Sequence, residues 1–84
     1  MTTYEIHASW GDSYVFHADS SDLSDFGFLV EEAVYVMCEM LPTRCNSYRA
    51  LAERLLAGIP VVVDYHGLEY ATLQLIGNQF SLIE

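Results

Sequence analysis

Residues 17–25 read HADSSDLSD and combine one histidine, three aspartates and three serines, which are residue types that can bind a metal ion. In an extended segment His17 and Asp19 can point to the same side. A tight site, however, needs three or four convergent ligands that are themselves held by hydrogen bonds. The spacing also lacks the central glycine and terminal glutamate of an EF-hand loop. We therefore expect no metal ion and no other cofactor.

The GDS tripeptide at residues 11–13 resembles the nucleophile block of one family of lipases and esterases. Here it stands in a predicted hairpin turn, and that family's Asp-x-x-His motif is missing downstream. The sequence also contains no G-x-x-x-x-G-K-[ST] or G-x-G-x-x-G phosphate loop. Because a domain of this size leaves little room for a substrate pocket, we expect a protein that is not an enzyme.

Charge is the unusual property of this chain of 84 residues, which carries 12 acidic residues, three arginines and no lysine, a net charge of −9. Residues 1–43 contain eight acids and no basic residue, and residues 44–84 contain four acids and the three arginines. Such a field repels nucleic acid and anionic membranes and attracts basic surfaces. With so few cations, direct binding of nucleic acid is disfavoured. The alternative is that the acids only maintain solubility.

The chain gives no sign of export from the cytoplasm. The first residues contain no basic segment followed by an apolar one, and no apolar run reaches the ~20 residues that span a bilayer. Cys38 and Cys45 form no C-x-x-C pair, so we expect two free thiols. A cytoplasmic protein is therefore expected.

The first strands are predicted from the segment TYEIHASW-GD-SYVFHA, which favours a hairpin with a two-residue turn at Gly11 and Asp12. Trp10 is then at the turn. One face of this hairpin would carry Tyr4, Ile6, Ala8, Val15 and His17. The other would carry Glu5, His7, Tyr14 and Phe16. Neither face is cleanly polar, so the pattern leaves open which one is buried.

Two helices follow. Apolar residues at three- and four-residue steps predict the first over about residues 24–41, with a stripe from Phe26 to Leu41, ended by Pro42. The second is predicted over about residues 47–57, with Asn46 or Ser47 as its cap and Gly58 and Pro60 beyond its end. Its buried stripe is predicted to comprise Tyr48, Leu51, Ala52 and Leu55.

The remaining sequence predicts three strands, IPVVVDY, LEYATLQLI and QFSLI, joined by turns at His66-Gly67 and Gly77-Asn78. In that register Asp64 lies opposite Glu69, and like charges so placed should face solvent or a cationic partner. The order β-β-α-α-β-β-β predicts a single α+β domain over residues 1–84. We expect an antiparallel sheet of about five strands with both helices on one face.

The first helix offers a candidate binding face. On a helical wheel Phe28 and Tyr35 lie opposite the apolar stripe, one above the other, and acidic residues surround them. Exposed aromatics ringed by carboxylates are typical of a protein interface. The alternatives are that both rings pack under a loop or against a second copy in a homodimer. The predicted partner-binding residues are Asp19, Asp22, Asp25, Phe28, Glu31, Glu32, Tyr35 and Glu39.

The entrance to this helix has a local role as well. Asp22 or Ser24 can accept hydrogen bonds from the free N–H groups of the first turn, and acids near that end suit the helix dipole. Capping requires only one or two residues. The surplus acids, Asp19 among them, are therefore expected to have no local structural role and to extend the negative surface.

With these acids and no lysine, the chain resembles the small acidic anti-CRISPR and antirestriction proteins of phages and mobile elements. The residues that carry the resemblance are Asp19, Asp22, Asp25, Glu31, Glu32 and Glu39. The likeness is one of type over the whole chain and rests on no shared motif. It implies an inhibitor in the host cytoplasm that occupies the basic, DNA-reading channel of a CRISPR effector.

The acids of the helix are too sparse for literal DNA mimicry. Asp25, Glu32 and Glu39 recur every seven residues, which is about 10.5 Å at helical rise, whereas DNA presents one charge per ~1.7 Å. We therefore expect inhibition by steric blocking of the effector, assisted by electrostatic attraction. Two other classes share the size and acidity: an immunity protein or antitoxin that neutralises a basic nuclease toxin, and a homo-oligomeric structural or accessory protein.

Overall fold

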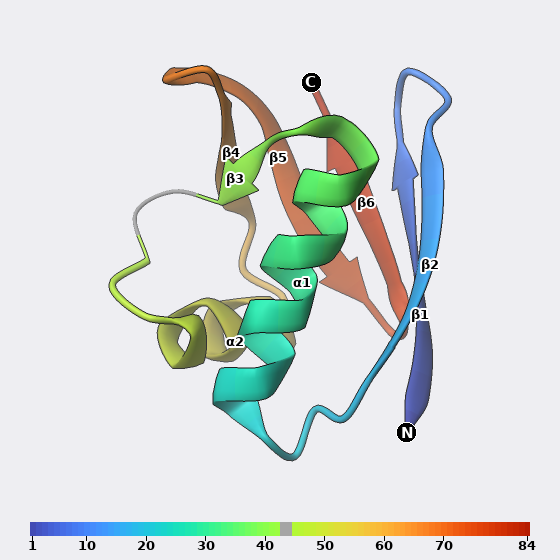
Figure 1. Cartoon of the computed structure of the whole chain (residues 1–84), viewed down its shortest axis with the longest axis vertical. Coiled ribbons are helices and arrows are strands. Elements are labelled where there is room, and N and C mark those ends of the chain that lie inside the picture. The colour runs from blue at the N-terminus through green and yellow to red at the C-terminus, as the bar shows by residue number, and fades with distance from the viewer. Residues whose placement is uncertain (43–44) are drawn as a thin grey trace.

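A curled sheet of six strands, covered on one side by two helices, forms the part of the chain that the computed structural model describes, residues 1–42 and 45–84 (Figure 1). The predicted α+β class and the predicted order of elements are confirmed, with one short strand added between the helices. The elements are β1 (Thr2–Ala8), β2 (Ser13–Ala18), α1 (Leu23–Cys38), β3 (Leu41–Pro42), α2 (Tyr48–Leu56), β4 (Val61–Tyr65), β5 (Leu68–Ile76) and β6 (Gln79–Ile83).

The strand order across the described sheet is β2-β1-β6-β5-β4-β3, and β1 pairs with β6 in parallel. The remaining pairs are antiparallel. The expected antiparallel sheet of about five strands is therefore corrected to a mixed sheet of six. After β2 the chain crosses the sheet through α1 to the far edge strand β3 and returns through α2 to β4. Strands β5 and β6 then lead back toward β1, which β6 joins in parallel.

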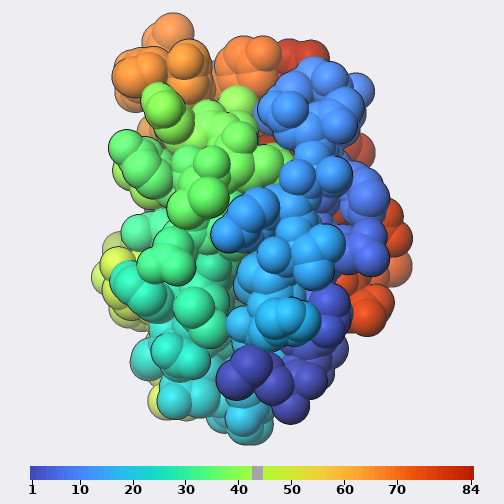
Figure 2. All heavy atoms as spheres, turned by 45° about the vertical axis from the view of Figure 1, so that its right-hand side comes forward, coloured from blue at the N-terminus to red at the C-terminus, as the bar shows by residue number. Residues whose placement is uncertain are grey.

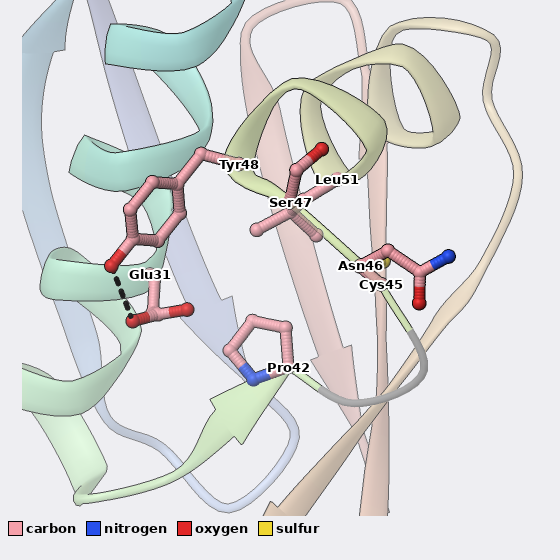
Figure 3. A pocket seen from close by; sticks show the side chains of 7 residues that line it. All are labelled: Glu31, Pro42, Cys45, Asn46, Ser47, Tyr48 and Leu51. Atoms are coloured by element: carbon pink, nitrogen blue, oxygen red, sulfur yellow. Dashed lines mark hydrogen bonds between the residues drawn. The ribbon is translucent and has the colours of Figure 1, made fainter.

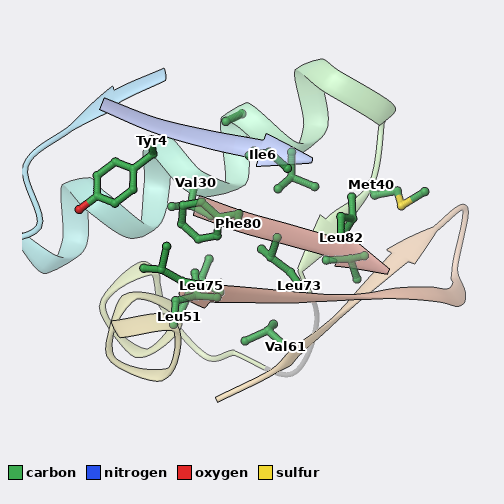
Figure 4. Packing of buried hydrophobic residues seen from close by; sticks show 14 of the residues in the cluster. Tyr4, Ile6, Val30, Met40, Leu51, Val61, Leu73, Leu75, Phe80 and Leu82 are labelled. Atoms are coloured by element: carbon green, nitrogen blue, oxygen red, sulfur yellow. The ribbon is translucent and has the colours of Figure 1, made fainter. Parts of the chain in front are cut away.

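The core lies between the inner face of the sheet and the helices (Figure 4). Its centre is a group of aromatic rings around Tyr4, which contacts Phe16, Phe26 and Phe80 at centroid distances of 5.6, 5.3 and 5.8 Å. Tyr4 and Phe80 come from β1 and β6, Phe16 from β2 and Phe26 from α1. These contacts fix α1 over the parallel pair and thereby orient its outer side.

The predicted register of the first hairpin is wrong. Ile6 pairs with Tyr14 and Tyr4 pairs with Phe16. The Ala8 amide donates to the Asp12 carbonyl at 2.8 Å, which closes a connection of three residues around Trp10. Because this register differs from the predicted one by an odd number of residues, every side chain of β2 changes face.

Tyr14 and Phe16 consequently turn toward the core, whereas Val15 is 55% exposed and His17 faces outward. Gly11, which takes a positive φ of 106°, ends the three-residue loop. Trp10 lies at the turn as predicted.

Both helix starts follow local chemistry. Asp22 Oδ1 accepts from the Asp25 amide at 3.1 Å and caps α1, and Ser47 Oγ accepts from the Ala50 amide at 3.1 Å and caps α2. Helix α1 ends three residues earlier than predicted, because Glu39 adopts a left-handed conformation with φ of 58°. Its amide donates to the Tyr35 carbonyl at 2.7 Å.

Ending α1 at Cys38 changes the residues that follow. Met40 turns into the core, whereas Leu41, predicted to belong to the buried stripe of the helix, is exposed and pairs with Asp64 as part of β3. In α2, Leu51, Ala52 and Leu55 are buried as predicted.

The last three strands confirm the predicted meander. Tyr65 pairs with Leu68 across the His66-Gly67 turn, and Ile76 pairs with Gln79 across Gly77-Asn78. Asp64 lies opposite Glu69, as predicted.

The two helices approach closely at Gly27, which is buried in the second turn of α1. A Cβ atom at this position would collide with the backbone carbonyl of Tyr48. The absence of a side chain at Gly27 therefore lets the start of α2 lie directly against α1.

Candidate protein-binding surface

The outer side of α1 carries the residues predicted to bind a partner. We call this side the acidic face; it comprises Asp25, Phe28, Glu31, Glu32, Tyr35 and Glu39. Phe28 is 42% exposed and Tyr35 is 50% exposed, so neither ring is covered by a loop. Helix α1 presents these two rings to solvent because Tyr4, Phe16 and Phe80 hold its opposite side in the core.

A hollow of about 290 Å³ lies at the middle of the acidic face. Phe28, Glu31, Glu32 and Tyr35 line it together with Leu41 from β3. The structure thus brings four of the predicted residues into one concavity. Leu41 was missed because it was assigned to the buried stripe; the early end of α1 turns its side chain outward.

Tyr48, the first residue of α2, extends the same surface and corrects its predicted place in a buried stripe. Its ring stands edge-on to Phe28 with centroids 5.4 Å apart, and its hydroxyl donates to Glu31 Oε1 at 3.4 Å (Figure 3). The hydroxyl group of Tyr48 could have indicated from the sequence that its side chain reaches the surface, because the polar end of a tyrosine requires water or a hydrogen-bond partner.

A second hollow, of about 310 Å³, shares Glu31 with the first and is also lined by Tyr48. Its remaining lining consists of Pro42, Cys45, Asn46, Ser47 and Leu51 (Figure 3). Ser47 already caps α2, and no histidine is among the described lining residues that could act as a base for it or for Cys45. The hollow offers contact area and hydrogen-bonding groups beside the acidic face.

The C-terminal end of α1 adds more negative charge. Tyr35, Glu39 and Leu41 line a third hollow, of about 420 Å³, together with Asp64 and His66. Among the described residues Asp64 Oδ1 is buried and has no hydrogen-bond partner. The predicted solvent-facing position is therefore only partly correct for Asp64, which is half-buried, while Glu69 opposite it is exposed.

The acids at the entrance to α1 lie outside the linings of these hollows, and two of them have local roles. Asp19 Oδ1 accepts from the Ser21 amide at 3.0 Å and from the Ser21 hydroxyl at 2.7 Å. Both hydrogen bonds lower the pKa of Asp19, and the one from the Ser21 hydroxyl has the larger effect. The expectation that Asp19 has no local structural role is therefore wrong, and Asp22 serves as the helix cap.

No arginine lines these hollows within the described chain. Arg49 and Arg54 belong to α2, where Arg49 pairs with Glu53 at 3.7 Å. Arg44 lies outside the described residues. The negative charge of the acidic face is thus not neutralised by arginines at the hollows that the structure describes.

The described residues do not form a metal site around the histidines, cysteines or aspartates. Among the described residues no group of three or more His, Cys, Asp or Glu side chains is placed to hold a metal ion. The His17 Nδ1 atom lies 3.0 Å from the Thr3 hydroxyl. Cys38 and Cys45 are both free thiols, as predicted.

In the described chain neither helix combines the length and the apolar character needed to cross a membrane. Comparisons with protein-family models, with characterised proteins and with solved structures yield no significant match to this chain.

Proposed function

We propose that this chain is a non-enzymatic inhibitor in the cytoplasm that docks through its acidic face on a basic surface of a nucleic-acid-handling protein. The observation that supports this best is the central hollow, where the half-exposed rings of Phe28 and Tyr35 stand beside the carboxylates of Glu31 and Glu32. From the resemblance to acidic anti-CRISPR proteins, we take a CRISPR effector as the preferred partner.

The aromatic rings would supply contact energy. Buried aromatic anchors dominate the affinity of many interfaces, especially when surrounding residues exclude water. Phe28 and Tyr48 already contact each other edge-on, so docking would immobilise rings that are partly ordered and would cost little side-chain entropy.

The carboxylates would supply orientation and selectivity. Glu31, Glu32 and Glu39 attract a basic partner and accelerate its association, while they repel DNA and RNA. The same charges disfavour a symmetric homodimer through this face, because the acidic residues of one copy would face acidic residues of the other.

The test is binding of the purified protein to purified CRISPR effector complexes, with target-DNA cleavage as a second readout. We expect Phe28→Ala/Tyr35→Ala to weaken binding at least about 30-fold, as loss of two aromatic anchors does. Glu31→Gln/Glu32→Gln should chiefly slow association and reduce its dependence on salt between roughly 50 and 300 mM. The matched control is Ile83→Ala, since Ile83 is exposed on the other side of the sheet.

Circular dichroism establishes that each variant is folded. Equal binding by wild type and Phe28→Ala/Tyr35→Ala would contradict the proposed surface. Binding to a basic nuclease toxin, and to none of the effectors tested, would support the proposed surface but identify the protein as an immunity protein instead of a CRISPR inhibitor. A homodimer that persists at high salt and dissociates in Phe28→Ala/Tyr35→Ala would contradict both the CRISPR inhibitor and the immunity protein.

A further inference from the structure

The β1–β2 loop, the end of α1 and the β4–β5 turn lie at the same end of the molecule (Figures 1 and 2). Three aromatic side chains gather there. Trp10, Tyr65 and Tyr70 line a hollow of about 300 Å³ there. Asp12, Cys38 and Met40 complete its lining. This hollow, which we call the aromatic corner, shares no lining residue with the central hollow of the acidic face.

The rings of the aromatic corner are inclined to one another. Trp10 and Tyr70 have centroids 5.7 Å apart and planes at 78°, and Tyr65 and Tyr70 have centroids 6.1 Å apart and planes at 56°. Tyr65 and Tyr70 are also partly exposed. The rings therefore meet edge-on or tilted, without parallel stacking, and form inclined walls of the hollow.

A carboxylate is fixed at this corner. The Trp10 Nε1–H group donates to Asp12 Oδ2 at 2.7 Å, which holds the indole in place and keeps the negative charge within the lining. Outside the lining, the carboxylate of Glu84 accepts a hydrogen bond from the Tyr70 hydroxyl, and this bond and the charge of Glu84 raise the pKa of Tyr70. No basic residue is among the described residues of the lining.

We propose that the aromatic corner binds an organic cation of the methylated-ammonium class. Faces of Trp and Tyr attract cations through their quadrupoles, and the attraction grows when the cation is readily desolvated, as a methylated ammonium is. A round trimethylammonium group touches several inclined ring faces at once. A planar guanidinium instead stacks parallel to a single ring, so the inclined walls suit it less well. The site is independent of the proposed docking function.

Trp10 makes the test direct, because it is the one tryptophan of the sequence and its fluorescence reports on the corner itself. The protein is titrated with tetramethylammonium chloride at constant ionic strength. Sodium chloride controls for salt, neopentyl alcohol supplies a neutral group of similar shape, and guanidinium chloride at low, non-denaturing concentration supplies the planar cation. We expect a saturable change in emission with tetramethylammonium and a much weaker one with the other three.

Substitutions locate the binding. Tyr70→Leu should weaken tetramethylammonium binding at least about tenfold through loss of the central ring. Asp12→Asn, which retains an oxygen acceptor for Trp10, should weaken it several-fold. Tyr35→Leu, a tyrosine replaced on the acidic face, should leave it unchanged. If Tyr70→Leu fails to fold by circular dichroism, Tyr65→Leu takes its place. Equal responses to the alcohol, preference for guanidinium, or unchanged binding after loss of a ring would each overturn the proposal.

Discussion

The ring of Tyr48 stands edge-on against the ring of Phe28 at a centroid distance of 5.4 Å and an interplanar angle of 80°. Tyr48 is the first residue of α2, and Phe28 lies on the outer side of α1. Their contact therefore joins the two helices at the surface. It also places the hydroxyl of Tyr48 next to Glu31. One aromatic pair thereby contributes both to the packing of the helices and to the shape of the acidic face.

Removing the Tyr48 ring should therefore affect stability. We expect Tyr48→Ala to lower the free energy of unfolding by about 1–2 kcal/mol, because an edge-on aromatic contact and partly buried area are lost. Tyr48→Phe keeps the ring and loses only an exposed hydrogen bond, which should cost about 0.5 kcal/mol or less. Urea denaturation measures both values, and equal effects of the two variants would show that the ring contact has no energetic role.

Gly27 should resist replacement by a better helix former. Alanine normally stabilises a helix interior by about 1 kcal/mol relative to glycine. At Gly27, however, the added methyl group collides with the Tyr48 carbonyl, and overpacking of this kind costs about 1–3 kcal/mol or more. We expect Gly27→Ala to be destabilised by about 1–3 kcal/mol in urea denaturation, while the exposed Ser24→Ala changes little. A stabilised Gly27→Ala would mean that α2 moves away from α1 without cost.

The register of the first hairpin predicts opposite outcomes for two neighbouring residues. Phe16 contacts Tyr4 and Phe80 at centroid distances of 5.6 and 5.9 Å, whereas Val15 faces solvent. Phe16→Ala should cost about 2–4 kcal/mol of stability, and Val15→Ala should change it by about 0.5 kcal/mol or less. Thermal or urea unfolding measures the stability of both variants. A larger loss for Val15→Ala than for Phe16→Ala would instead support the register with the two-residue turn.

Features specified by neighbouring residues were the ones that the sequence predicted well. Asp22 and Ser47 cap their helices through side-chain oxygens three residues from the amides that they bind. The tight turns at residues 66–67 and 77–78 follow from glycine. The helical spacing of Phe28 and Tyr35 likewise placed both rings on the exposed side of α1. Each of these features depends on local geometry alone.

Features that depend on distant partners were not predicted. Nothing in β1 or β6 indicates that the two strands pair in parallel, and this pairing brings residues 75 positions apart, Thr3 and Asn78, into contact. The register of β2 was missed because both of its faces contain apolar residues. Leu41 and Tyr48 joined the candidate surface only because α1 ends early and the helices meet at Gly27.

The hydrogen bonds of Asp19 predict a measurable shift in its titration. The Ser21 hydroxyl and amide lower the pKa of Asp19 below its ordinary value of 3.8. Because the folded pKa is depressed, the resulting stabilisation is present above that ordinary value and is lost as the pH falls through the folded pKa.

Ser21→Ala removes the stronger of the two hydrogen bonds and should raise the pKa of Asp19 toward 3.8. Carboxyl-carbon NMR over pH 2–6 follows this residue directly. Ser24→Ala serves as the control, since Ser24 makes no hydrogen bond to Asp19 in the described structure. An Asp19 pKa that is the same in wild type and Ser21→Ala would refute the local role of this acid.

The place of β6 between β1 and β5 bears on how the protein is made. During synthesis β1 leaves the ribosome about 75 residues before the segment around Asn78 that it pairs with. At ordinary rates of translation this interval lasts roughly 4–15 s. Throughout that time Tyr4 and Phe16 lack their ring contacts with Phe80 of β6, so this part of the apolar face of the nascent hairpin stays uncovered until β6 is made.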